Sequence, residues 1–440
     1  MNSAGANAGG YHCTVTKSQP APIPVASRQL DNGLRVTASH DPLAPGIAVN
    51  LWYGVGSADD PRQAKGFAHL FEHLMFAGSA HVADGQHGVI LESLGGMCNA
   101  TTSADRTNYF ETVPLGALDL ALWLEADRLS SLRVSRASLN TQRFVVREEK
   151  RQRYDNQPYG DQWLLLLGLG FPPDHPYATP TIGSMSDLDA ASLNDVRAFH
   201  ATWYRPSNAH LVVVSPLPDD EIFRQADKYL SFIDCDGASP IRVPPPALPP
   251  IEDVPRQTVT RPVPRSVLHL IWRTPPLTHP DRPAVGLALD VLASGQACRL
   301  HRDLVRGRGL SQAVGAPDTG LSRGTSLSGL SASPVAGGDL AALEQAMLEH
   351  LEQLAADGPT EAELSLAKAQ IERDWSAELA GLADRADAIN EAAALWGRAE
   401  TVNDQLDRWL APTAGDIAAA AHQWLHPDNR AVLEYLEAAS

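Results

Sequence analysis

Trp203-Tyr204-Arg205-Pro206-Ser207-Asn208, near the middle of the chain, has a counterpart near the end, Trp424-Leu425-His426-Pro427-Asp428-Asn429. The dipeptides Asp195-Val196 and Asp416-Ile417 precede the two stretches, and a strand-like run follows each of them. Asp, Trp, Pro and Asn all recur at one constant offset of 221 residues. Four coincidences in a single register predict that the chain holds two homologous domains.

The beginnings of the two halves also correspond. Each half reads as an apolar strand, then a polar loop containing Asp, Arg and Pro, then an apolar helix. The strand, loop and helix are expected at residues 47–52, 60–62 and 64–77 in the first half, and at residues 267–272, 281–283 and 284–293 in the second. The order of these elements supports the duplication.

Domain boundaries follow from composition. Residues 236–264 are too rich in proline for a packed helix or a central strand, so they are expected to form a linker. The predicted organisation is a flexible leader (1–25), an N-terminal domain (26–235), the Pro-rich linker (236–264) and a C-terminal domain (265–440). The mixed strand and helix patterns, including helical periodicity at 339–356 and 360–397, predict an α+β fold. Each domain is expected to be a mostly antiparallel sheet covered by helices on one face.

The charge balance restricts the partners. Lys plus Arg number 35 and Asp plus Glu number 52, which gives a formal net charge of −17. Such a chain repels phosphate backbones, so nucleic acid is not expected as a partner. An acidic cavity could favour basic peptides, but the favoured interpretation is that the charge only keeps the protein soluble. No apolar run approaches the roughly 20 residues that span a bilayer. The expected location is cytoplasmic if the N-terminus is native, and periplasmic if a signal peptide was removed.

The segment His69-Leu70-Phe71-Glu72-His73 carries the strongest chemical signal. Two histidines four residues apart lie on one face of a helix, close enough to share a metal ion. Glu72 can then accept a proton from a water molecule held at the metal. This order is the inverted zinc-peptidase motif H-x-x-E-H. The alternative is two ordinary helix histidines beside a surface glutamate. The corresponding second-half stretch, Leu289–Ser294, holds neither His nor Glu, which indicates that the fold does not require them.

A catalytic zinc site needs a third protein ligand, and residues 142–152 are the best donor segment. This stretch has helical periodicity and two adjacent carboxylates, Glu148 and Glu149. Adjacent helix residues point about 100° apart, so one of the two can be the ligand. The residues alone leave the choice open.

From about residue 28 to 437 the chain resembles the M16 metallopeptidases, which include insulinase, pitrilysin and the mitochondrial processing peptidase. The resemblance implies a zinc-dependent peptidase with Zn²⁺ bound by His69, His73 and Glu149. Glu149 is the residue implied because the glutamate of the family follows the second histidine by about 76 residues and ends a Val-Val-x-x-Glu pattern. Glu72 is then the catalytic base. Sites of His and Glu also accept cobalt or manganese.

A second part of the resemblance lies in Gly95–Thr102 (GGMCNATT). It implies a sheet edge beside the zinc, where an extended peptide substrate would add as a strand along Asn99, Ala100 and Thr101. Read alone, the same stretch could be an ordinary hairpin in which Asn99 serves the turn.

The chain departs from the family pattern in its second half. Relatives that act as single chains or homodimers carry an Arg and a Tyr seven residues apart, which bind the substrate backbone. Val305 and Gln312 stand at those positions here, and Arg306 could replace the Arg after a shift of one residue. We therefore expect a homologous M16 subunit to supply the pair in a heterodimer, with a homodimer as the alternative, and substrates to be peptides or unfolded segments enclosed in a shared chamber.

Two other functions compete with this prediction. The chain could be a non-catalytic assembly subunit, like the core proteins of respiratory complex III that share the fold, or a metal-dependent hydrolase acting on something other than peptides. The complete set of His69, Glu72, His73 and Glu149 disfavours the first, and the Asn99-Ala100 edge motif disfavours the second.

Overall fold

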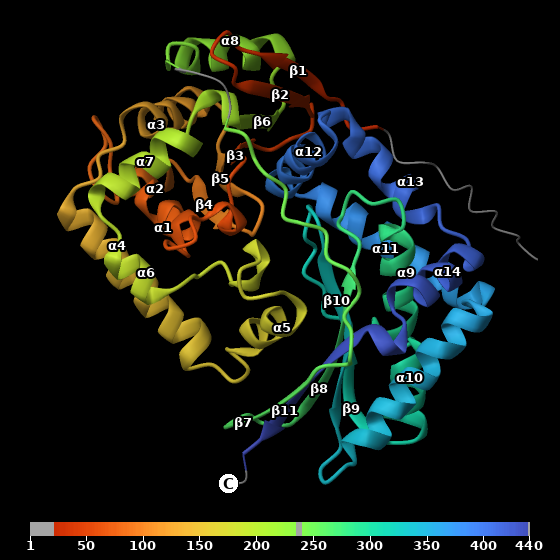
Figure 1. Ribbon diagram of the computed structural model, residues 1–440. Coiled ribbons are helices and arrows are strands. Elements are labelled where there is room, and N and C mark those ends of the chain that lie inside the picture. The colour runs from red at the N-terminus through yellow and green to blue at the C-terminus, as the bar shows by residue number, and fades with distance from the viewer. Residues whose placement is uncertain (1–21, 235–239, 439–440) are drawn as a thin grey trace, which may run out of the picture.

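The computed structural model describes residues 22–234 and 240–438, which form two β-sheets with helices packed around them (Figure 1). The first sheet has six strands in the order β1-β2-β6-β3-β5-β4, and the second has five in the order β7-β11-β8-β10-β9. The first consists of β1 (Ala26–Gln29), β2 (Arg35–His40), β3 (Ile47–Tyr53), β4 (Met97–Thr102), β5 (Thr107–Val113) and β6 (Ala209–Ser215). The second consists of β7 (Arg256–Arg261), β8 (Val267–Thr274), β9 (Ser311–Gly315), β10 (Ser326–Pro334) and β11 (Arg430–Glu437).

The duplication is visible in the topology. Without β1, the first sheet has the same strand order as the second, and in each sheet one parallel pair, β2–β6 or β7–β11, adjoins antiparallel pairs. Helices α7 (Leu193–Trp203) and α14 (Ala414–Trp424) lie at the predicted offset of 221, and each begins with a capping box, at Ser192 and Thr413. The predicted α+β class with two homologous domains is confirmed.

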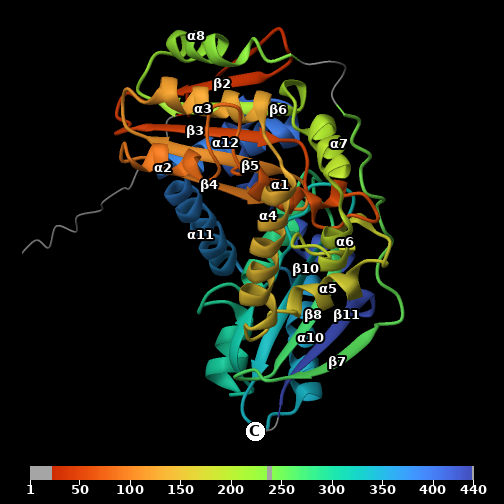
Figure 2. The same ribbon diagram turned by 90° about the vertical axis from the view of Figure 1, so that its left-hand side faces the viewer.

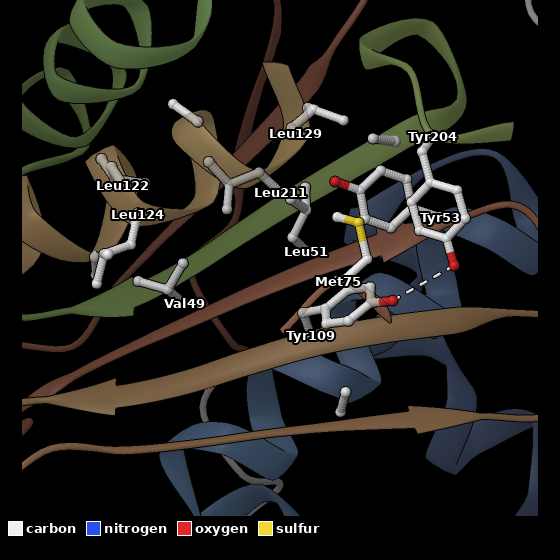
Figure 3. Packing of buried hydrophobic residues seen from close by; sticks show 14 of the residues in the cluster. Val49, Leu51, Tyr53, Met75, Tyr109, Leu122, Leu124, Leu129, Tyr204 and Leu211 are labelled. Atoms are coloured by element: carbon white, nitrogen blue, oxygen red, sulfur yellow. Dashed lines mark hydrogen bonds between the residues drawn. The ribbon is translucent and has the colours of Figure 1, made fainter. Parts of the chain in front are cut away.

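Helices of the first half cover one face of the first sheet. They are α1 (Phe67–Leu74), α2 (Gln86–Glu92), α3 (Leu118–Ser131), α4 (Arg136–Lys150), α6 (Met185–Ala190), α7 and α8 (Asp219–Leu230). Side chains alternate along β3, so Val49, Leu51 and Tyr53 point toward α3 and join one apolar core (Figure 3). Burial of this continuous core holds the sheet and α1 in fixed relation.

The other helices belong to the second half. They are α9 (Arg282–Ala293), α10 (Leu340–Asp357), α11 (Glu361–Ala380), α12 (Leu382–Trp396), α13 (Gln405–Leu410) and α14. The helical pattern predicted for 360–397 is confirmed, and it forms two helices, interrupted at Gly381, whose extended backbone (φ −78°, ψ 134°) ends α11 and starts α12. The break lets α12 turn away from its own half.

One helix from each half packs against the sheet of the other half. Helix α12 packs against β3 and β6 of the first sheet, where Ile389, Ala392 and Ala393 meet Ala48 and Val212 (Figure 1). Helix α5 (Gln162–Gly170), from the first half, packs against β8 and β11 of the second sheet. The expectation of helices on one face alone is thus wrong, because each sheet is also covered on its second face by a helix from the other half. In the perpendicular view the two sheets lie one above the other (Figure 2).

The boundaries differ from prediction at the linker. Residues 256–261 of the predicted linker 236–264 form strand β7, which pairs with β11. Their alternating sequence, Arg-Gln-Thr-Val-Thr-Arg, suits an edge strand, and it contains no proline, since Pro255 precedes it and Pro262 follows it. Residues 1–21 of the predicted leader lie outside the described residues. Within the described ranges, every helix is too short or too polar to cross a membrane.

Candidate metal centre

Helix α1 carries the His69–His73 motif and is fixed at its start by Asp60. Gly66 precedes the helix in a left-handed conformation (φ 98°), which favours glycine. The Asp60 carboxylate accepts hydrogen bonds from the backbone N–H groups of Gly66 (2.7 Å) and Ala68 (2.8 Å). A negative side chain at this end also matches the helix dipole. Burial raises the pKa of Asp60 to about 7. The predicted loop around Asp60 therefore caps the N-terminus of α1 and fixes the position of the His69–His73 motif.

His69 and His73 lie one turn apart with ring centroids 4.9 Å from each other. His69 is the more buried, and burial, with His73 adding to it, lowers the pKa of His69 to about 4. Its imidazole is thus neutral at pH 7, which is the form that binds a metal ion.

Helix α4 brings Glu149 to the two histidines. Oε2 of Glu149 lies 3.2 Å from Nε2 of His73 and 3.5 Å from Nε2 of His69. Burial acts to raise the pKa of Glu149. The hydrogen bond with His73 and the electrostatic interactions with both histidines act the other way and outweigh burial, so the pKa is lowered. Glu148 points elsewhere and pairs with Arg151 at 3.3 Å. Of the two carboxylates, Glu149 is the one that the fold places beside the histidines.

The donor set fits a zinc ion. One nitrogen from each histidine and one oxygen from Glu149 all lie within 4.8 Å of one another. Two neutral imidazoles and one carboxylate form the His₂Glu set of catalytic zinc sites, which leave a fourth position open.

Glu72 lies on the same helix, one residue before His73. Burial raises the pKa of Glu72, while a hydrogen bond with the side chain of Thr102 and the charge of His73 oppose the rise. Its partner Thr102 ends strand β4, so Glu72 lies between the metal-ligand set and the edge of the sheet. A carboxyl whose pKa is raised is suited to proton transfer near neutral pH.

Strand β4 is an edge strand, as the GGMCNATT motif predicts. Among the described strands it pairs with β5 alone. Asn99 and Thr101 are exposed on one face, whereas Ala100 points to the apolar core on the other. The unpaired side of β4 offers backbone groups to an additional strand.

Residues after Glu149 contribute contacts that the sequence analysis missed. Helix α4 passes into a π-helical turn, Arg151–Asp155, of the kind often found at functional sites. Nη1 of Arg153 lies 2.8 Å from Oε1 of Glu149. The spacing of four residues between Glu149 and Arg153 was the available signal for this pair.

A cavity of about 1000 Å³ is lined by residues of both halves, two of which interact electrostatically with residues of the candidate metal centre. Tyr154, whose pKa is raised by burial and by the charge of Glu149, lines it on one side. Arg106, which interacts electrostatically with Glu72, lines it on another. Residues of α12 complete the wall nearest to Arg106. This cavity depends on the exchange of helices and gave no signal in the sequence.

A second cluster of metal-binding residue types lies beneath α1: His87, Glu111 and Glu125, all buried. Nε2 of His87 lies 2.7 Å from Oε1 of Glu111, and the guanidinium of Arg128 binds both oxygens of Glu125. Arg128 also lies 4.3 Å from the ring centroid of Tyr109. Because the Arg128 guanidinium already binds both carboxylate oxygens of Glu125, this cluster is a buried ion network rather than a metal site.

The second-half positions at which the sequence resemblance predicts an Arg and a Tyr lie at or just before the counterpart of β4, strand β9. Val305 and Arg306 belong to a π-helical turn, His301–Gly307, and Gln312 is exposed on β9, the edge strand of the second sheet. Arg306 is hydrogen-bonded to Gln296 at 3.0 Å. The structure therefore gives Arg306 a local partner on the surface of its own domain.

Two family profiles match the sequence. The one described as Insulinase (Peptidase family M16) matches residues 35–165, and the one described as Peptidase M16 inactive domain matches residues 190–371. The four residues of the candidate metal centre all lie in the first of these regions.

Named relatives are zinc proteases. The zinc protease PqqE of Helicobacter pylori is 31% identical over 283 residues, which cover 63% of this chain and 62% of that protein. An uncharacterized zinc protease of Mycobacterium leprae is 28% identical over 411 residues, covering 91% of this chain and 89% of that protein. The alignment thus spans less than two thirds of the first relative and most of the second.

Solved structures share the whole fold. The crystal structure of a protease from Helicobacter pylori superimposes with a TM-score of 0.86 at 25% identity, covering 94% of this chain and 100% of that one. Pitrilysin superimposes with a TM-score of 0.77 at 19% identity, covering 97% of this chain and 46% of that one, which shows the fold alone. By its two family profiles, its zinc-protease relatives and its two-sheet fold, the chain belongs to peptidase family M16.

Proposed function

We propose that this chain is the zinc-binding subunit of a metalloendopeptidase that hydrolyses peptides or unfolded segments. The observation that carries the proposal is that one ligand atom from each of His69, His73 and Glu149 lies within 4.8 Å of the others. Glu72 lies on α1, the helix that also carries the two histidines. Relatives named zinc proteases support both the metal and the reaction class.

The side chains have distinct roles in this proposal. His69, His73 and Glu149 would hold the ion, which when bound supplies Lewis-acid polarisation of a peptide carbonyl. Glu72 accepts a proton from the attacking water and passes it to the departing amine. The raised pKa of Glu72 brings proton uptake and release closer to neutral pH.

Strand β4 orients the substrate. A peptide that adds to its free edge is held by backbone hydrogen bonds, so its position does not depend on side-chain identity. Asn99, Ala100 and Thr101 would provide these contacts beside Glu72. A segment packed inside a folded domain cannot pair with β4 along its whole length, which favours extended segments as substrates.

A homologous partner is part of the proposal. Val305 and Gln312 stand where an Arg–Tyr pair is expected, and Arg306 is held by Gln296. We infer that a second M16 subunit supplies that pair and closes a chamber over β4, in a heterodimer or a homodimer. The alternative of a non-catalytic assembly subunit has no support among the relatives described above.

The decisive experiment measures metal-dependent peptide hydrolysis. The purified chain, alone and with a homologous subunit, is treated with a chelator and then given back Zn²⁺, while cleavage of an unstructured peptide is followed by mass spectrometry. We expect chelation to abolish cleavage and one equivalent of zinc to restore it. Cleavage that survives chelation would refute the metal mechanism, and equal rates with and without a partner would refute the need for one.

A further inference from the structure

The connection between β4 and β5 contacts its counterpart in the second half. Residues 103–106 join β4 to β5, and residues 316–325 join β9 to β10 at the corresponding edge of the second sheet. Oδ2 of Asp105 accepts hydrogen bonds from the backbone N–H (2.9 Å) and the hydroxyl (2.7 Å) of Ser322. Oδ1 of Asp105 accepts a hydrogen bond from Nε of Arg323 at 2.7 Å. The hairpin that carries the free edge is therefore bound to the half that lacks the metal ligands.

Arg323 binds a second carboxylate of the first half. Nη1 of Arg323 lies 3.2 Å from Oδ1 of Asp59, and the two side chains are 15% and 5% exposed. Arg242, in the segment that joins the halves, also binds Asp59 and donates to the backbone oxygen of Asp105 at 2.8 Å. Two guanidinium groups and two carboxylates thus form one ion cluster between the halves. Because each charge has a partner of opposite sign, the cluster is a structural connection and not a ligand site.

A short 3₁₀ turn, Ser57–Asp59, packs directly on the β4–β5 connection. Two backbone N–H groups of this turn donate to the carbonyl oxygens of residues 103 and 104, at 3.1 and 3.0 Å. A Cβ atom at Gly56, just before the turn, would lie 2.5 Å from the backbone of Ala104, so a larger residue would push the two segments apart. The carboxylates that Arg323 binds therefore belong to segments that are already in contact.

Two short paths lead from the ion cluster to α1, the helix that carries the metal-binding motif. Along the first, Asp59 adjoins Asp60, whose carboxylate accepts the backbone hydrogen bonds that cap the start of α1. Along the second, Asp105 follows Thr102, the last residue of β4, by three positions. The side chain of Thr102 is hydrogen-bonded to Glu72. Both the position of α1 and the orientation of its glutamate thus depend on segments that Arg323 holds.

We propose that Arg323 is a positioning residue for the reaction, supplied by the half without metal ligands. It fixes the β4–β5 connection and the start of α1, and so sets the orientation of Glu72 beside a peptide bound along β4. Its hydrogen bonds go to Asp59 and Asp105, so its effect on the reaction passes through these two carboxylates. The planar guanidinium can bridge two carboxylates at once, which an ammonium group cannot reproduce.

The inference rests on the proposed function, and steady-state kinetics test it on the zinc-loaded chain with its partner subunit. Rates of peptide cleavage are expressed per bound zinc, so that a loss of folded protein does not lower them. Arg323→Gln should lower kcat about 10-fold and change KM less than about 2-fold, because a misplaced base slows the chemical step while the rest of β4 still binds the peptide. Arg323→Lys should give an intermediate kcat, since its ammonium group reaches one carboxylate.

A matched control separates positioning from stability. The side chain of Arg299 is 10% exposed and binds Glu363 at 2.8 Å, in an ion pair that lies within the second half. Arg299→Gln should therefore destabilise the chain and leave kcat per bound zinc unchanged. Asp105→Asn should lower kcat as Arg323→Gln does. The double variant should lose less activity than the product of the two single losses, because both side chains act through one contact.

Hydrogen exchange, followed by mass spectrometry, tests the same connection without turnover. Compared with Arg299→Gln, Arg323→Gln should speed the exchange of backbone amides in residues 57–70 and 97–106. Equal exchange in these two variants, or an unchanged kcat per bound zinc in Arg323→Gln, would overturn the positioning role while zinc-dependent cleavage by the unmodified pair still supports the peptidase function. If the unmodified pair shows no zinc-dependent cleavage, the peptidase function is refuted, and faster exchange would then support only the connection between the halves.

Discussion

Arg153 binds one oxygen of Glu149 and leaves the other to the histidines. Nη1 of Arg153 lies 2.8 Å from Oε1, whereas Oε2 faces Nε2 of His73 at 3.2 Å. Adjacent carboxylates of one helix thus have different partners, since Glu148 pairs with Arg151 and Gln152 at the surface. This division predicts which substitutions near the centre affect the metal.

Glu149→Gln should abolish stable zinc binding, and Glu148→Gln should not. Losing a ligand should weaken zinc binding by more than the roughly 10–100-fold that loss of an outer hydrogen-bond partner costs. Competition with a chromophoric chelator measures the two affinities on otherwise matched proteins. Equal zinc affinity in both variants would remove Glu149 from the ligand set.

Arg153→Gln should change how Glu149 binds a metal ion. Without Arg153, both carboxylate oxygens of Glu149 are free to bind the metal ion. A cobalt ion with more ligands absorbs visible light less strongly, so cobalt substituted for zinc reports the change. The cobalt spectrum of Arg153→Gln should therefore be weaker than that of the unmodified chain, with Arg153→Lys closer to it. Arg151→Gln is the matched control, and a spectrum of Arg153→Gln identical to that control would contradict the role of Arg153.

Glu72→Gln should retain zinc and lose peptidase activity. The amide keeps the size of the side chain but cannot accept the proton, and general-base catalysis contributes about 10²–10⁴-fold to a rate. Zinc content by elemental analysis and the initial rate of peptide cleavage are measured on the same preparation. Retained activity, or loss of the metal, would show that Glu72 has another role.

The contribution that Glu111 and Glu125 make to stability, in their buried cluster with His87, should fall as pH rises through neutrality. Burial raises the pKa values of Glu111 and Glu125 to about 7, although Arg128 opposes the rise in each case. A carboxyl whose pKa is higher in the folded chain binds its proton more tightly when folded. Its stabilising effect is therefore complete below the ordinary carboxyl pKa and is lost as pH rises through about 7.

Glu111→Gln should remove much of that dependence, because the amide cannot ionise beside His87 and Glu125. Between pH 6 and pH 8 we expect the free energy of unfolding of this variant to fall less than that of the unmodified chain, by on the order of 1–2 kcal/mol. Urea unfolding at both pH values measures the difference, with the exposed Glu92→Gln on the neighbouring helix as a control. Identical pH profiles would show that Glu111 is not the titrating group.

The sequence by itself determined the repeated architecture and the chemistry of the motif. Strands β4 and β5 lie where Gly95-Gly96 and Pro114 bound two short strand-like runs, so local punctuation sets their outer ends. His69, Glu72 and His73 were identifiable because helix geometry fixes which residues four apart share a face. Periodicity and spacing are local properties, so they can be read along the chain.

The tertiary structure decided what lies across from these elements. The residues alone did not distinguish Glu148 from Glu149, because the choice depends on the rotation of α4 against α1. Asp387 gave no signal, because it lies more than 300 positions after His73 and reaches Asn50 and Trp52 of the first sheet only through the break at Gly381 and the crossing of α12. Long-range packing of apolar faces sets both relations, and no local pattern encodes which face of which helix will meet a given sheet.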